Sequence, residues 1–116
     1  IPGPSAVTAA FSVAGIAAQQ FFFAGYPPPK KKRNKFFEDL GGREEPIILF
    51  ESPHRLLKTL KDLQKTIPDR RLAVFKELTK IHERSWHGTA EDILSMLANE
   101  PIKGEWVIIV TGKEKR

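Results

Sequence analysis

The sequence predicts a single α/β domain in which helices cover a mixed five-stranded sheet. Its 116 residues suit one hydrophobic core. Short apolar runs typical of buried strands alternate with segments of helical periodicity, which indicates layered α/β architecture. Two predicted strands also follow one another with no helix between them, so at least one strand should be antiparallel. The predicted domain is 1–116, with a basic loop over 27–35.

The chain opens on a proline-glycine turn that leads into a predicted helix over 5–17. Ser5 stands at the N-cap position and Gly15 suits the C-terminal cap. Because nearly every side chain of this helix is apolar, we expect it to be buried on most sides. The start at Ile1 has neither an initiator Met nor a signal-peptide layout, which indicates a piece of a longer protein.

A strand is predicted at Phe21–Phe23, an aromatic run that ends at Gly25. The prolines at 27–29 donate no backbone hydrogen bond and cannot continue it. The basic run follows and leads into a short helix that ends at 40–42. The apolar run 47–50 is typical of a strand covered on both faces.

The second half of the chain predicts two helices and three strands. Ser52-Pro53 resembles an N-cap followed by proline at the first helical position, so an amphipathic helix is predicted over 53–66. Thr89 should cap the other helix, with Asp92 completing a capping box. The predicted strands are 72–75, 84–88 and 106–110.

The positive charge is concentrated in one place. Lys and Arg number 19 against 14 Asp and Glu, and five of the bases fall within six positions: Lys30, Lys31, Lys32, Arg33 and Lys35. Cations on a loop can contact several phosphates and release their counterions, which predicts salt-sensitive nucleic-acid binding. A solvated helix face is the alternative. Arg84, Trp86 and His87 can add a stacking surface, unless Trp86 belongs to the core.

Several function classes are excluded by composition. The absence of Cys excludes thiol catalysis, disulfides and Cys-ligated zinc, and fits a reducing cytosol. The three histidines have no metal-ligand spacing, so no metal is expected. No apolar run approaches the length of a membrane span, and no glycine-rich nucleotide-binding motif is present.

Polar residues follow the predicted strands where open α/β sheets bind ligands. Glu51, His54 and Arg55 come after the second strand, and Thr79 follows the third. At the first helix, the amides at Ser5 and Ala6 can bind a carboxylate or hydroxyl. The alternatives are an ordinary capped helix, a solvated turn at Thr79, and a surface ion pair between Glu51 and Arg55 or Arg70.

Six short motifs follow one another along the chain. In order they are Ile1-Pro2-Gly3-Pro4-Ser5-Ala6, Phe23-Ala24-Gly25-Tyr26-Pro27-Pro28, Phe50-Glu51-Ser52-Pro53-His54-Arg55-Leu56, Lys76-Glu77-Leu78-Thr79-Lys80-Ile81-His82-Glu83, His87-Gly88-Thr89 and Lys103-Gly104-Glu105. Together these motifs resemble the tetrapyrrole (corrin/porphyrin) methylase family, within it the branch that methylates cytidine 2′-hydroxyls of bacterial 16S ribosomal RNA. The resemblance runs from Ile1 to about Gly112.

The resemblance implies the second domain of a two-domain fold that binds S-adenosylmethionine between its domains, usually as a homodimer. Motif by motif, it implies cofactor contacts at Ser5, Ala6, Glu51 and Thr79. It also implies a small-subunit ribosomal RNA substrate that is held by the basic run and Arg55. The implied location is the cytoplasm, with neither a metal cofactor nor a membrane partner. His54 is the candidate general base. Two positions depart from the pattern: Ala24 replaces an acidic residue and Phe50 replaces Tyr. A methylase of a tetrapyrrole precursor and a non-enzymatic RNA-binding module are the alternative functions.

Overall fold

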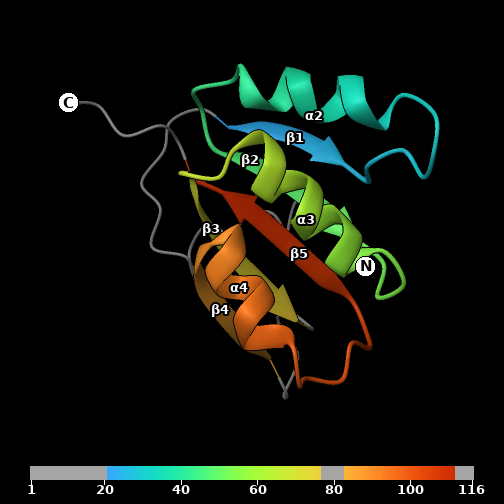
Figure 1. The fold of residues 1–116 in the computed structure, drawn as a ribbon, viewed down its shortest axis with the longest axis vertical. Coiled ribbons are helices and arrows are strands. Elements are labelled where there is room, and N and C mark those ends of the chain that lie inside the picture. The colour runs from blue at the N-terminus through green and yellow to red at the C-terminus, as the bar shows by residue number, and fades with distance from the viewer. Residues whose placement is uncertain (1–20, 77–82, 112–116) are drawn as a thin grey trace.

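The computed structural model describes residues 21–76 and 83–111, which form five strands and three helices (Figure 1). The predicted helix over 5–17 lies outside these residues. The elements in chain order are β1 (Phe22–Gly25), α2 (Arg33–Gly41), β2 (Ile47–Glu51), α3 (Leu56–Thr66), β3 (Arg71–Lys76), β4 (Arg84–Thr89), α4 (Ala90–Leu97) and β5 (Trp106–Val110).

The sheet is mixed, as predicted, and has the strand order β1-β2-β5-β3-β4. β1 runs parallel to β2, whereas β5 lies antiparallel to both β2 and β3, and β4 lies antiparallel to β3. β1, β2 and β3 therefore all point the same way. Their carboxyl ends meet at one edge of the sheet, where β4 and β5 begin.

One hydrophobic core joins the three helices to one face of this sheet (Figure 1). Side chains alternate between the two faces of a strand, so every second residue points toward the helices. From the strands the core takes Ile47, Leu49, Leu72, Val74, Ile108 and Val110, and from the helices Phe37, Leu40, Leu56, Leu60, Leu63, Ile93 and Leu97. No helix of the described ranges has the length and apolarity to cross a membrane.

The start of α3 differs from the prediction. The helix begins at Leu56, three residues later than expected, and Arg55 occupies its N-cap without a capping side-chain hydrogen bond. Ser52 is therefore not the N-cap of α3: its amide donates to Glu51 Oε1 over 2.8 Å, and its carbonyl accepts from the Arg55 amide over 3.2 Å. A turn over 52–55 therefore separates the strand from the helix.

The predicted capping box at α4 is confirmed. The Thr89 amide donates to Asp92 Oδ2 over 3.0 Å, and the Asp92 amide donates to Thr89 Oγ1 over 3.3 Å. The hydrogen bonds from the Thr89 backbone and side chain hold the pKa of Asp92 below its ordinary value. The ionised carboxylate therefore stabilises the helix end.

This cap predicts a pH dependence of stability. A carboxylate with a lowered pKa in the folded state stabilises the protein above its unfolded pKa, and that contribution is lost as the pH falls through the folded pKa. We expect Asp92→Asn to lower the free energy of unfolding at neutral pH and to flatten its decline below about pH 5 in urea titrations. Glu91→Gln removes a carboxylate from the same helical turn without touching the capping box, so it is the control and should lower the free energy of unfolding less than Asp92→Asn does.

Candidate functional site

The edge where β1, β2 and β3 end is hereafter called the rim. The pairing registers place four side chains in one row across it: Glu51 opposite Trp106, Trp106 opposite Lys76, and Lys76 opposite Arg84. Open α/β sheets bind ligands beyond the carboxyl ends of their strands, so the rim is the candidate functional site.

Glu51 ends β2 with its carboxylate turned inward. The side chain is 2% exposed. Its Oε1 accepts the Ser52 amide over 2.8 Å, and its Oε2 accepts the Thr59 hydroxyl over 2.7 Å. The predicted alternative of an ion pair with Arg55 or Arg70 is wrong, since the guanidinium of Arg70 donates to backbone carbonyls instead. The carboxylate thus orients the backbone at the strand end and the start of the following turn.

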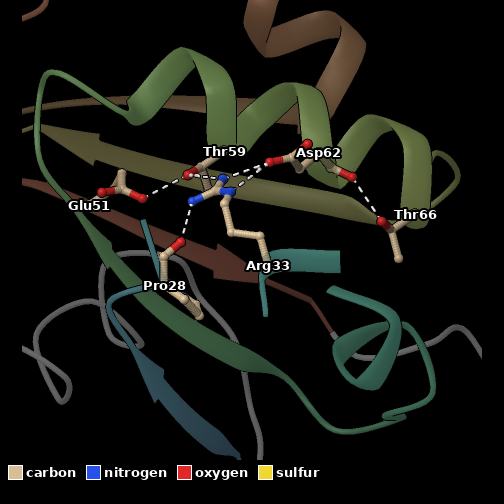
Figure 2. Close-up of polar contacts among 6 residues, drawn as sticks. All are labelled: Pro28, Arg33, Glu51, Thr59, Asp62 and Thr66. Carbon is tan, nitrogen blue, oxygen red and sulfur yellow. Dashed lines mark hydrogen bonds and ion pairs between the residues drawn. The ribbon is translucent and has the colours of Figure 1, made fainter. Parts of the chain in front are cut away.

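The Thr59 hydroxyl also joins Glu51 to a buried arginine (Figure 2). The guanidinium of Arg33 donates to Thr59 Oγ1 over 3.2 Å, to Asp62 Oδ2 over 2.6 and 3.2 Å, and to the Pro28 carbonyl over 2.8 Å. These residues come from the proline segment, α2, α3 and the end of β2. Arg33 therefore ties the segment after β1 to the rim.

The burial of Arg33 corrects the prediction that five cations project together from a loop. Arg33 is the first residue of α2, is 5% exposed, and forms an ion pair with Asp62. It is not available to a phosphate. The four lysines of the run, Lys30, Lys31, Lys32 and Lys35, are exposed. Lys32 stands at the N-cap of α2 with φ 67°, a left-handed conformation that turns the chain sharply into the helix.

The turn over 52–55 exposes His54 and Arg55 close to the end of β2. By contrast, Trp86 is 7% exposed and stacks on Trp106, with ring centroids 5.5 Å apart. Of the two alternatives for Trp86, a stacking surface with Arg84 and His87 or a place in the core, the structure confirms the core.

Ser5, Ala6 and Thr79 lie outside the described residues, so of the four predicted cofactor contacts the structure places only Glu51. Over 21–76 and 83–111, no group of three His, Asp or Glu side chains lies close enough to hold a metal ion.

Thr59 and Asp62 were missed by sequence reasoning. Thr59 falls in the apolar stripe of α3, between Leu56 and Leu60, and a hydroxyl in such a stripe requires a buried partner. That pattern was a usable signal for a polar network beneath the rim.

Comparison with known proteins places this fold in one family. The family model described as Tetrapyrrole (Corrin/Porphyrin) Methylases matches residues 1–94. A relative from Thermotoga maritima, named ribosomal RNA small subunit methyltransferase I, is 36% identical over 98% of this chain and 51% of its own length. A relative of the same name from Synechocystis is 40% identical over 97% of this chain and 41% of its own length. The chain thus spans about half the length of these curated relatives.

Solved structures share the fold at lower identity. Cobalt precorrin-4 methyltransferase, a cobalamin biosynthetic enzyme, superposes with a TM-score of 0.71 at 20% identity, covering 96% of this chain and 50% of the enzyme. Uroporphyrin-III C-methyltransferase from Thermus thermophilus, solved with S-adenosyl homocysteine, has a TM-score of 0.60 at 14% identity, covering 96% of this chain and 51% of the enzyme. From its sequence and its fold, this chain belongs to the tetrapyrrole (corrin/porphyrin) methylase family.

Proposed function

We propose that this chain is the C-terminal half of an S-adenosylmethionine-dependent methyltransferase that acts on ribose 2′-hydroxyls of small-subunit ribosomal RNA. The observation that carries the proposal is the Arg33 network, which fastens a segment with three exposed lysines, Lys30 to Lys32, to the rim at Glu51. Cations at successive positions of an exposed segment suit the regularly spaced phosphates of a nucleic-acid strand. The names of the relatives from Thermotoga maritima and Synechocystis support the same substrate.

The rim suits one side of a cofactor site. Both oxygens of Glu51 are used within the chain, so this residue would contact a ligand through its backbone. Trp106, in the same row, has a buried indole N–H without a hydrogen-bond acceptor among the described residues. A buried donor of this kind is costly unless an acceptor reaches it, and the carboxylate and ribose oxygens of the cofactor are acceptors. With Glu51, we propose Ser5, Ala6 and Thr79 as cofactor contacts.

Bound S-adenosylmethionine supplies an electrophilic methyl group for in-line attack by a hydroxyl. The contribution of this chain is to position that hydroxyl, because holding two reactants in the correct geometry supplies much of the rate. The exposed lysines and Arg55 would hold the RNA backbone against the rim. His54, on the turn after β2, is the residue we propose to receive the hydroxyl proton. The protein would act in the cytoplasm as a homodimer.

The direct test is methyl transfer by the complete gene product that contains this chain. It should transfer labelled methyl groups from S-adenosylmethionine to the ribose of small-subunit RNA that lacks the modification, and none to a uroporphyrinogen. Label on the tetrapyrrole instead would favour the alternative substrate. RNA binding with no transfer to either substrate would favour a non-enzymatic module.

The lysines provide a second test. Replacing Lys30, Lys31, Lys32 and Lys35 together by Gln should reduce the slope of log affinity against log salt by up to about 3, since each contact to a single strand contributes about 0.7. Fluorescence anisotropy with a labelled single-stranded RNA measures this slope.

A charge-matched pair of variants controls for net charge. Lys30→Gln/Lys31→Gln removes two cations beside the rim, whereas Lys61→Gln/Lys65→Gln removes two exposed cations further along α3. Only the first pair should change the salt slope appreciably. Equal effects of the two pairs would mean that the bound RNA is not localised at the rim.

A further inference from the structure

Two aromatic rings remain exposed at the end of β1. Phe23 is 48% exposed and Tyr26 is 58% exposed, although rings of this size are normally buried. Both pack against Phe50, which is 4% exposed: the Phe23 and Phe50 centroids lie 5.3 Å apart in an edge-to-face arrangement, and those of Tyr26 and Phe50 lie 5.8 Å apart. Phe50 therefore holds two rings in place while leaving much of their surface open.

The backbone fixes this pair at the rim. Gly25, between the two rings, has φ +70°, which turns the chain at the end of β1. Tyr26 is followed directly by the prolines at 27–29 and then by the exposed Lys30 to Lys32. The Arg33 guanidinium donates a hydrogen bond to the Pro28 carbonyl over 2.8 Å. Because Pro28 lies between Tyr26 and the lysines, this bond fixes the segment that carries both.

Exposed rings beside cations match the chemistry of single-stranded nucleic acid. A base has an aromatic face that stacks on Phe or Tyr, while the adjacent phosphates require positive charge. An uncharged apolar partner would engage the rings alone, whereas a nucleic-acid strand engages the rings and the lysines together.

We infer that Phe23 and Tyr26 form a stacking platform for unpaired bases of the RNA, next to the nucleotide that is presented to the rim. The inference rests on the proposed function in requiring an RNA substrate. It adds a base-stacking subsite to the phosphate contacts of the lysines and explains how a single-stranded segment would be selected over a duplex.

Tyr26 is the only tyrosine of these 116 residues, so comparing the complete gene product labelled with 3-fluorotyrosine with its Tyr26→Phe variant assigns the ¹⁹F resonance of Tyr26. A single-stranded RNA of about ten nucleotides should shift this resonance, whereas an abasic ribose-phosphate oligomer of equal length and charge should not. Tyr26→Ala should weaken RNA binding about tenfold, and Tyr26→Phe should restore it, because stacking needs only the ring. Met96→Ala, at an exposed apolar residue of α4, should have no effect.

The outcomes separate this inference from the proposed function. Salt-sensitive RNA binding that is unchanged by Tyr26→Ala, or an equal ¹⁹F shift with the abasic oligomer, overturns the platform and leaves the RNA substrate standing. A change in oligomeric state on Tyr26→Ala, without a change in RNA affinity, would make these rings a contact between copies and also overturn the platform. No binding of RNA by the unaltered complete gene product overturns the proposed function itself.

Discussion

Gly88→Ala is expected to lower the free energy of unfolding by about 3 kcal/mol, from backbone strain and overpacking together. Gly88 has φ +144°, which a side chain rarely tolerates. A Cβ at this position would lie 2.8 Å from both Cβ and Oδ2 of Asp92. Moving Asp92 to relieve the contact would break the capping box of α4, so the substitution cannot be accommodated by a local shift.

Urea denaturation followed by the fluorescence of the buried Trp86 and Trp106 measures this change. Gly42→Ala is the matched control, because Gly42 has φ −81° and a Cβ there would approach only the Asp39 carbonyl oxygen, at 3.6 Å. The control should be neutral or stabilise by up to about 1 kcal/mol through the unfolded state. Similar midpoints for the two variants would show that Gly88 is not under steric constraint.

The three central strands, β2, β5 and β3, were predictable because burial on both faces leaves a continuous apolar run, as at 47–50 and 106–110. The Thr89–Asp92 cap was predictable because both partners lie within one helical turn. The strand order was not predictable, because inserting β5 between β2 and β3 pairs segments that are far apart in the chain and share the same apolar pattern.

The candidate site was predicted in part for a similar reason. Strand ends such as Glu51 can be located from the sequence, but the direction of a side chain there depends on distant partners. A basic run indicates charge without showing which cation turns inward. Arg33 is buried because Thr59 and Asp62, 26 and 29 residues away, offer it acceptors beneath the rim.

Arg33→Met is expected to lower the free energy of unfolding by about 2–4 kcal/mol, because it leaves the Asp62 carboxylate and the Pro28 carbonyl without their donor. We expect the lower part of this range, because the Asp62 side chain is 27% exposed and its carboxylate can form hydrogen bonds with water instead. Met keeps much of the aliphatic stem but removes the guanidinium carbon that lies 5.1 Å from the centroid of the Phe37 ring, so the change reports the polar contacts and this cation–π contact together. Arg33→Lys should recover only part of the loss, since one ammonium group cannot reproduce the guanidinium fork.

If the hydrogen bond from Arg33 to the Pro28 carbonyl keeps residues 27–32 next to the rim, its loss should let these residues move away before the domain unfolds. Trypsin should then cleave Arg33→Met after Lys30, Lys31 or Lys32 faster than it cleaves the unaltered chain under native conditions. Lys35→Met, an exposed position on the same helix, should change neither stability by more than about 0.5 kcal/mol nor the rate of this cleavage. Destabilisation of Arg33→Met without faster cleavage would mean that the arginine supports the helix packing alone, and that the lysines are held at the rim by other contacts.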